Sequence, residues 1–139
     1  MRKTTVASLV CVTIAAFLAG CATAPKGPTD GEMVMKRVEE MVAAAKEKNY
    51  AAFDTLVSGN FSSSAVGDKV ALLDLMHTAD GMGLADDFEV DLSQAKTVVT
   101  GDKCTVGPIT ASANIGSITV TGYGVKEKGV WMIVGGEPE

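Results

Sequence analysis

The sequence predicts an α+β fold in which helices pack on one face of a curved antiparallel sheet. Between residues 30 and 80, apolar side chains recur with the spacing of amphipathic helices. From residue 88 onward, apolar and polar side chains alternate as in half-buried strands, and short glycine-containing turns separate the alternating stretches. Helices that precede the strands, rather than alternate with them, favour an antiparallel sheet covered on one face.

The first helix is expected to begin near Thr29 and to end near residues 46–49. Thr29 and Glu32 have the spacing of a capping box, in which each side chain accepts from the other's backbone N–H, and Asp30 is an alternative cap. Basic side chains near the far end suit the negative pole of a helix. The apolar stripe consists of Val34, Val38, Met41, Val42 and Ala45.

Two more helices are expected before the strands. Residues 50–57 predict a short second helix, and the serine-rich segment 61–67 predicts a loop or a short strand. Residues 69–79 predict a third helix with a broad apolar face, which the glycines of segment 80–83 end. The side chains expected to face inward are Phe53, Leu56 and Val57 in the second helix and Val70, Leu72, Leu73, Leu75 and Met76 in the third.

Four strands are expected after the helices. The first begins at residue 88 and continues through residues 98–99 to a tight turn at Gly101-Asp102. Pro108 should lie at a bulge, an edge or an unpaired donor position, because proline has no backbone N–H, and Gly122 and Gly124 allow strong curvature. The later strands are expected at 104–113, 117–125 and 130–134, with turns at 114–116 and 126–129.

The N-terminus carries the layout of a secretory signal. A basic start at residues 1–3 precedes an apolar stretch at residues 6–17, which is too short to span as a mature helix, and small residues follow. The tetrad Leu18-Ala19-Gly20-Cys21 resembles the lipobox of bacterial lipoproteins, in which the cysteine thiol is acylated and becomes the mature N-terminus. This resemblance implies that Leu18, Ala19 and Gly20 are recognised by the signal peptidase and that Cys21 is lipidated.

The chain is therefore expected to comprise a signal peptide at 1–20, a flexible tether at 21–31 and one domain at 32–136. Ala22 stands where enteric-type lipoproteins retained at the inner membrane have an aspartate. This predicts a cell-envelope protein anchored in the outer membrane and facing the periplasm. In a host with one membrane, the same anchor would hold it on the outer face of the plasma membrane.

The charge of the chain argues against several partners. Loss of Arg2 and Lys3 with the signal leaves 10 of the 12 basic residues against 17 acidic ones, so the formal net charge changes from −5 to −7. An acidic domain without a basic cluster is not expected to bind nucleic acid or anionic headgroups. Its membrane attachment should therefore come from covalent lipid such as palmitate.

The three cysteines have different expected fates. Cys11 leaves with the signal, Cys21 is consumed by the anchor, and Cys104 remains alone, so the domain can form no internal disulfide. Cys104 lies in a strand-like segment and is expected to be a small buried apolar group. The sequence has no zinc-ligand spacing, phosphate-binding loop or nucleophile elbow, so no metal and no cofactor are expected.

Five segments in order resemble the nuclear transport factor 2-like (SnoaL-like) superfamily over residues 33–135. They are Lys48-Asn49-Tyr50-Ala51-Ala52-Phe53-Asp54-Thr55-Leu56, Asn60-Phe61, Gly67-Asp68-Lys69-Val70-Ala71-Leu72-Leu73, Gly101-Asp102-Lys103-Cys104-Thr105-Val106 and Lys126-Glu127-Lys128-Gly129-Val130-Trp131-Met132-Ile133. The resemblance implies a cone-shaped fold with three N-terminal helices on a curved sheet. Members use the interior of the cone as a catalytic cavity or as a surface for a ligand or partner, so the fold does not determine the function.

A catalytic cavity would need a carboxylate or a histidine that moves a proton. His77 is the chain's single histidine, and Asp80 follows it by three positions, so the two could share one helical surface as a proton shuttle. The alternative is a solvated or capping histidine near a helix end, which the sequence favours. Asp54 is a further catalytic candidate, although it is expected to face water on the second helix.

Candidate ligand-pocket residues are the aromatic groups Tyr50, Tyr123 and Trp131. Tyr123 shares a strand surface with Thr119 and Thr121, and alternation alone does not decide which surface is concave. The large apolar area of Trp131 favours a core or hairpin anchor over a ligand platform.

The leading functional hypothesis is a lipid-anchored, non-enzymatic domain that binds a small apolar ligand or an envelope protein. The alternative is a cofactor-independent isomerase or dehydratase that uses His77 with Asp80 or Asp54. A third hypothesis is a homodimer formed through the exposed sheet surface, which the family resemblance permits.

Overall fold

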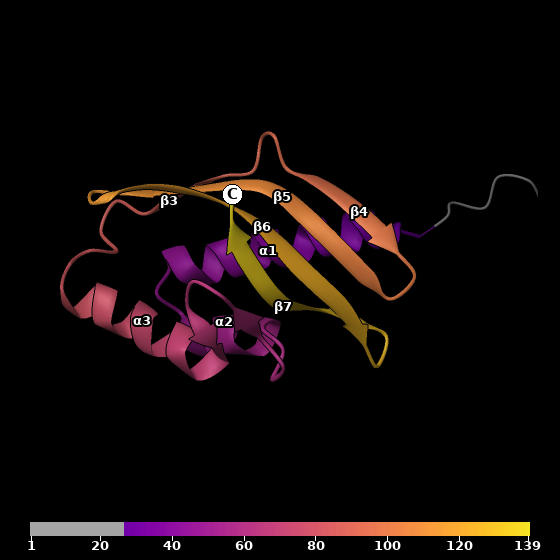
Figure 1. Cartoon of the computed structure of the whole chain (residues 1–139), viewed down its shortest axis with the longest axis horizontal. Helices are drawn as coiled ribbons and strands as arrows, with labels where there is room; N and C mark the ends of the chain where they lie inside the picture. The colour runs from indigo at the N-terminus through magenta and orange to yellow at the C-terminus, as the bar shows by residue number, and fades with distance from the viewer. Residues whose placement is uncertain (1–26) are drawn as a thin grey trace, which may run out of the picture.

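The computed structural model describes residues 27–139 (Figure 1). The expected signal peptide at 1–20, the lipobox with Cys21, and the tether up to residue 26 lie outside the described residues. Figure 1 shows the sheet with α1 alongside it and with α2 and α3 below it in this view. Three helices therefore precede an antiparallel sheet, and the predicted α+β fold class is confirmed.

The helices are α1 (Asp30–Lys46), α2 (Tyr50–Leu56) and α3 (Lys69–Gly81). The strands are β1 (Ser62–Ser63), β2 (Gly67–Asp68), β3 (Glu89–Asp91), β4 (Lys96–Thr100), β5 (Lys103–Ala113), β6 (Gly116–Glu127) and β7 (Val130–Pro138). The serine-rich segment thus forms a two-stranded hairpin of β1 and β2. The last strand continues four residues beyond the expected end at residue 134.

The main sheet has the order β3-β5-β6-β7, and β4 pairs with β5 as well. Since β6 occupies one edge of β5, both β3 and β4 lie along its other edge. The expectation of one continuous strand from residue 88 to residue 99 is therefore wrong. The backbone N–H of Ser93 donates to Asp91 Oδ1 at 2.8 Å and that of Ala95 donates to Leu92 O at 3.0 Å, so these donors close a turn instead of extending the ladder.

Two bulges bend the long strands. The pairing of β5 with β6 shifts between Val106 and Ile109, which places Pro108 at a bulge, one of the three positions expected for it. The pairing of β6 with β7 shifts next to Tyr123. Gly124 has a packing role rather than a conformational one, because a Cβ there would lie 2.6 Å from Cys104 Sγ.

The predicted capping box begins α1. Thr29 Oγ1 accepts from the backbone N–H of Glu32 at 3.2 Å, and the Glu32 carboxylate accepts from that of Thr29 at 2.7 Å. Asp30, expected to lie in the tether, is the first helical residue. Its carboxylate accepts from Trp131 Nε1 at 3.0 Å and from Lys126 Nζ at 2.8 Å, so it joins the start of α1 to the β6–β7 hairpin.

The core lies where α1 packs on one end of the sheet. Val34 and Val38 of α1 are at most 1% exposed, and full burial of such a side chain contributes about 1.5–3 kcal/mol. Their cluster includes Cys104, Trp131 and Ile133, which are also buried. The expected burial of Cys104 and the core position of Trp131 are confirmed.

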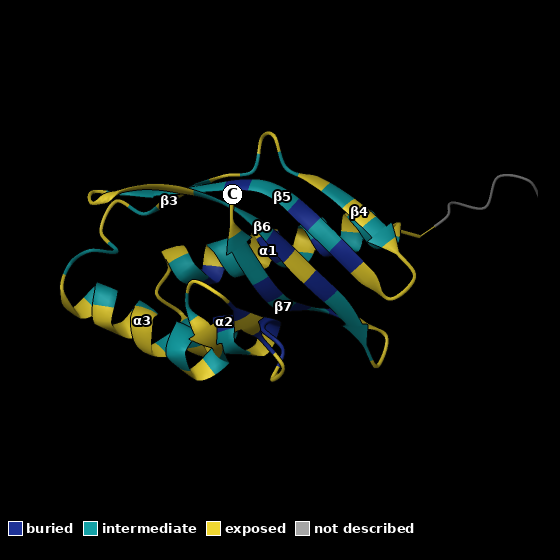
Figure 2. Cartoon of the chain, in the orientation of Figure 1, coloured by how far each residue is buried: buried dark blue, intermediate teal, exposed yellow. Residues whose placement is uncertain are grey.

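Helix α3 packs much more loosely than α1. None of its residues is fully buried, and its apolar side chains Val70 and Leu75 are 66% and 53% exposed. In Figure 2 it carries only the intermediate and exposed colours, whereas dark blue segments mark β5, β6 and β7. Of the five side chains predicted to face inward, Leu72, Leu73 and Met76 are partly buried and pack against the core, whereas Val70 and Leu75 are exposed.

Substitution of Gly135 tests the close contact of β1 with β7. A Cβ at Gly135 would lie 2.7 Å from the backbone oxygen of Ser62, so Gly135→Ala should displace β1 and lower the free energy of unfolding by about 1–3 kcal/mol. Gly136→Ala is the matched control, because its nearest neighbour would be an ordinary 3.8 Å away. Urea denaturation compares the two, and equal losses would contradict this packing.

Candidate functional site

An apolar cavity of about 400 Å³ lies between the helices and the far end of the sheet. Figure 1 shows the elements that enclose it, with α3 on one side and β3, β5 and β6 on the other. The lining residues are Val38, Met41, Val42, Ala45, Phe53, Val57, Phe61, Ser63, Ala65, Val66, Leu72, Leu75, Phe88, Val90, Ile109, Ala111, Ile118, Val120, Gly122, Gly135, Gly136 and Pro138.

The lining has almost no polar chemistry. Of these 22 residues, Ser63 alone has a polar side chain, and none is an acid, a base or a cysteine. The volume falls within the range of roughly 300–1,000 Å³ for small-molecule sites. Leu75 and Ile118 are 53% and 49% exposed, so the cavity opens to solvent between α3 and β6. Such a site favours an apolar molecule and offers no group for proton transfer.

Strand alternation explains how the sequence makes this cavity. In β6, Ile118, Val120 and Gly122 face inward, so the concave face carries the even-numbered residues. The odd-numbered residues, including Thr121 and Tyr123, therefore face the convex side. Gly122 has no side chain to fill the space, and a Cβ there would lie 3.2 Å from Val106 Cγ1.

His77, Asp80 and Tyr50 lie together at the end of α3, outside the cavity lining. The rings of His77 and Tyr50 meet edge to face, with centroids 4.3 Å apart. Asp80 forms an ion pair with Lys48, which also pairs with Asp86 at 3.2 Å. His77 and Asp80, two of the three catalytic candidates, thus lie close together. They contact Tyr50 and Lys48, and neither lines the cavity.

Local charges perturb this cluster. The Lys48 ammonium group holds the pKa of Asp80 below its usual value of 3.8. Partial burial raises the pKa of Tyr50, and the Asp80 carboxylate raises it further. Asp80 therefore remains ionised near neutral pH, and Tyr50 keeps its proton.

Asp54 occupies a different place from His77. Its carboxylate pairs with Lys69 Nζ at 3.0 Å, and its side chain is about half exposed, as expected from the sequence. The same ammonium group donates to the backbone oxygens of Asp54 and Val57 at 2.8 and 2.9 Å. Asp54 and Lys69 thus connect the end of α2 to the start of α3.

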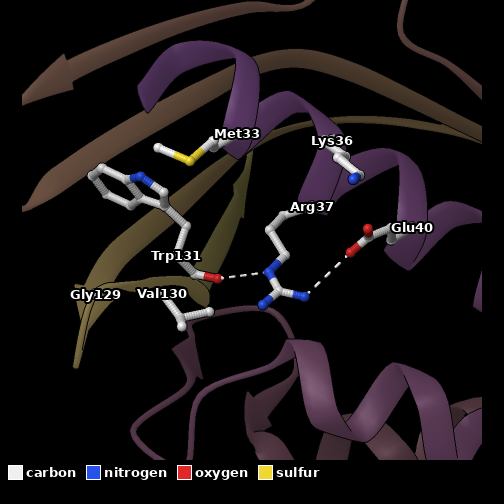
Figure 3. A pocket seen from close by; sticks show the side chains of 7 residues that line it. All are labelled: Met33, Lys36, Arg37, Glu40, Gly129, Val130 and Trp131. Carbon is white, nitrogen blue, oxygen red and sulfur yellow. Dashed lines mark hydrogen bonds and ion pairs between the residues drawn. The ribbon is translucent and has the colours of Figure 1, made fainter. Parts of the chain in front are cut away.

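The aromatic pocket candidates also lie away from the apolar cavity. Tyr123 lies on the convex face, where Val98 occupies the same row across β5 and is 61% exposed. Trp131 contributes to a shallow pocket of about 310 Å³ on the outer side of α1 (Figure 3). There Arg37 donates to Trp131 O at 3.1 Å and to Glu40 at 3.2 Å, so its guanidinium group is already engaged.

Sequence reasoning did not select the residues that line the cavity. The inward alternation of Ile118 and Val120 was a usable signal, but it did not identify the concave face. Nothing in the sequence distinguishes Ser63 from the other serines of segment 61–67, which predicts a loop or a short strand.

Residues 27–139 contain neither a cluster of metal ligands nor a membrane-spanning helix. Within this part of the chain, no three acidic, histidine or cysteine side chains are grouped closely enough to hold a metal ion. None of the helices there is both long enough and apolar enough to cross a bilayer.

No known sequence family and no curated protein matches this chain. Solved structures match its fold at low identity. Bd1075 from Bdellovibrio bacteriovorus aligns with a TM-score of 0.65 and 16% identity over 76% of this chain. The alignment covers only 38% of the length of Bd1075. A nuclear transport factor 2-like protein of unknown function from Pseudomonas putida KT2440 aligns with a TM-score of 0.63 and 12% identity over 76% of this chain and 82% of that one.

The CaMKII hub from S. rosetta also aligns, with a TM-score of 0.63 and 20% identity over 84% of this chain and 98% of that one. At these identities the likeness establishes the fold alone. The chain therefore has the nuclear transport factor 2-like fold, as the resemblance implied, with helices packed on a curved antiparallel sheet.

The charge cluster at the end of α3 should make stability depend on pH in the acid range. Because the pKa of Asp80 is lowered in the folded state, its contribution is present above pH 3.8 and is lost as the pH falls below that value. Asp80→Asn should therefore lower the free energy of unfolding at pH 7 and have little effect at pH 2. Asp74→Asn, an exposed position on the same helix, is the control. An Asp80→Asn effect of equal size at both pH values in urea denaturation would contradict this assignment.

Proposed function

We propose that this protein is a lipid-anchored component of the cell envelope whose domain binds a small apolar ligand without transforming it. The observation that supports the proposal is the cavity of about 400 Å³ in which one of 22 lining residues has a polar side chain. Apolar surface transferred from water into such a site contributes about 25 cal/mol per Å². A ligand there gains affinity from burial alone.

The composition of the lining favours binding over catalysis. Removal or transfer of a proton needs an acid or a base within hydrogen-bond distance of the reacting group. The described lining contains neither, and His77 and Asp80 belong to a separate ion-pair cluster. An isomerase or dehydratase that used His77 with Asp80 or Asp54 would have to bind its substrate outside this cavity.

The sequence of the first 21 residues supports the lipid anchor. A basic start, a short apolar stretch and the tetrad Leu18-Ala19-Gly20-Cys21 are together typical of exported proteins that are acylated on cysteine. Several acyl chains on Cys21 would hold the protein firmly, since one chain alone gives only marginal membrane binding. The absence of aspartate at Ala22 favours the outer membrane in a host with two membranes.

An uncharged apolar fluorophore tests the cavity. N-phenyl-1-naphthylamine should bind the full chain and should accept excitation energy from Trp131, the single tryptophan. Ala45→Phe places a larger side chain in the lining and should weaken binding about tenfold or more, because it occupies ligand volume. The fluorophore is titrated into the full chain held in lipid vesicles, and the rise in sensitised emission gives the affinity. The emission from vesicles without protein is subtracted.

Two variants control for indirect effects. Ala43→Phe makes the same change at an exposed position of α1 and should leave the affinity unchanged. His77→Ala should also leave it unchanged, because His77 does not line the cavity. Equal loss in Ala43→Phe and Ala45→Phe, or no binding to the parent chain, would show that the cavity is not the binding site.

Metabolic labelling tests the anchor separately. Labelled palmitate should enter the full chain and should not enter Cys21→Ser, because that variant lacks the thiol that is acylated. Cys104→Ser should remain labelled, since Cys104 is buried in the core. Label retained in Cys21→Ser, or a mature N-terminus at another residue, would be incompatible with the proposed anchor.

A further inference from the structure

The shallow pocket beside Trp131 has charged side chains of both signs on one wall (Figure 3). Lys36, Arg37 and Glu40 project from the same face of α1, because residues three and four positions apart are neighbours on a helix. The opposite wall is the start of β7, where Val130 is 41% exposed. The pocket is therefore the reverse of the apolar cavity, since it can bind charged groups.

The cations of this pocket keep donors for a ligand. Arg37 uses Nε–H for Trp131 O and one Nη–H for Glu40, and a guanidinium group has further N–H donors. Lys36 is exposed, and within residues 27–139 no carboxylate lies at ion-pair distance from its ammonium group. Two neighbouring cations with free donors can bind the oxygens of one phosphate group.

Glu40 makes the pocket unsuitable for a simple anion. Its carboxylate pairs with Arg37 at 3.2 Å, so an incoming phosphate would be repelled by a negative group beside its binding partners. A ligand that carries an ammonium group next to its phosphate would instead pair with Glu40 as well. Val130 and Met33 add apolar surface for the methylene groups that join the two charges.

The pocket adjoins the end of the domain from which the chain leads to the expected anchor. Asp30 begins α1, and it accepts from Trp131 Nε1 at 3.0 Å. Residues 21–29 precede Asp30, and a chain of that length spans at most roughly 30 Å. The apolar cavity lies toward the other end of α1, a helix of 17 residues that is about 25 Å long. An anchor at Cys21 would thus keep lipid headgroups within reach of the pocket.

Exposed negative charge lies at the cavity end of the domain. Asp74 is on α3, Asp86 and Asp87 precede β3, and Glu89 begins it, and all four residues are exposed. Lipid phosphates would be repelled from this end more strongly than from the pocket, where Lys36 and Arg37 lie. The charge distribution therefore favours an orientation in which the pocket is nearer to the bilayer.

Building on the lipid anchor of the proposed function, we propose that this pocket binds the zwitterionic headgroup of a phospholipid in the membrane that holds the protein. Lys36 and Arg37 bind the phosphate, and Glu40 binds the ammonium group. A weak site is sufficient, because a short tether makes binding intramolecular, with an effective concentration on the order of millimolar. The bound headgroup orients the domain so that the apolar cavity is held away from the bilayer surface.

A water-soluble headgroup tests the site on the full chain in uncharged maltoside micelles. Glycerophosphoethanolamine should shift the NMR signals of the Trp131 indole N–H and the Val130 amide in a saturable way, because both residues line the pocket. Lys36→Gln should weaken binding about fivefold, the effect of one lost hydrogen bond. Lys46→Gln, an exposed position of α1 outside the pocket, should leave the affinity unchanged. No saturable shift in the parent chain would overturn the proposal.

Glu40→Gln distinguishes a zwitterion from an anion. It should weaken glycerophosphoethanolamine about fivefold and should leave glycerol phosphate unchanged or bound more tightly, because the repelling carboxylate is gone. Glu39→Gln, an exposed neighbour outside the pocket, should change neither affinity. If the parent chain binds glycerol phosphate as tightly as glycerophosphoethanolamine, the site is one for free phosphates and the proposal is wrong.

Nanodiscs of phosphatidylethanolamine and phosphatidylcholine test whether the headgroup belongs to the membrane. A trace of lipid with a nitroxide on its headgroup should broaden the Trp131 indole signal of the acylated chain. It should not broaden the amide signal of Ile115, which lies at the opposite end of β6 and is 71% exposed. Lys36→Gln should reduce the broadening at Trp131. Equal broadening at both residues, or broadening at Ile115 alone, would contradict the proposed orientation.

These outcomes are distinct from a failure of the proposed function. If palmitate labels Cys21 but the headgroup does not shift the Trp131 signal, the anchor stands and the headgroup site fails. If the headgroup binds in micelles but Cys21 is not acylated, the lipid anchor fails and a membrane source for the headgroup fails with it.

Discussion

The long curved sheet presents more apolar concave surface than the helices cover, and this imbalance shapes the molecule. Helix α1 buries one end of that surface, where Val34 and Val38 pack against Cys104 and Trp131. Asp30 fixes this end by accepting from both Trp131 and Lys126. Toward the other end of the sheet, α1, α2 and α3 line an apolar cavity instead of packing directly on the strands. In a fully packed domain that surface would be part of the core.

Polar contacts hold the two ends of helix α3, which lines one side of the cavity. At its start, Lys69 pairs with the Asp54 carboxylate and donates to the backbone oxygens of Asp54 and Val57. At its end, Asp80 pairs with Lys48 in the turn between α1 and α2. Between these points no residue of the helix is fully buried. Leu72 and Leu75 of this helix line the cavity, and a ligand that fills it would bury apolar surface that now contacts solvent.

The sequence predicted the parts of the fold that depend on local chemistry. The capping box at Thr29, the buried Trp131 and the bulge at Pro108 follow from the residues themselves. The break between β3 and β4 did not follow, because alternation continues past a turn that Asp91 and Leu92 close through hydrogen bonds. Apolar periodicity also cannot distinguish a helix face that packs in a core from one that borders a cavity, so the position of α3 was unpredictable.

The position of the cavity also could not be predicted from the sequence. His77 and Tyr50 are candidates in the sequence because their side chains are ionisable. In the structure they lie together in a cluster outside the cavity. Apart from Ser63, the residues that line the cavity are glycines and apolar side chains, which the sequence does not distinguish from core residues, and sheet register and curvature bring them together.

Xenon binding tests most directly whether the far end of the sheet encloses accessible apolar space. Xenon enters apolar cavities without needing polar contacts. In methyl NMR spectra under xenon pressure, resonances of Val42, Val90 and Val120 should shift, because these side chains line the cavity. Those of Val34 and Val106, in the packed end, should not. No response at any lining methyl, or a response confined to Val34 and Val106, would contradict this account.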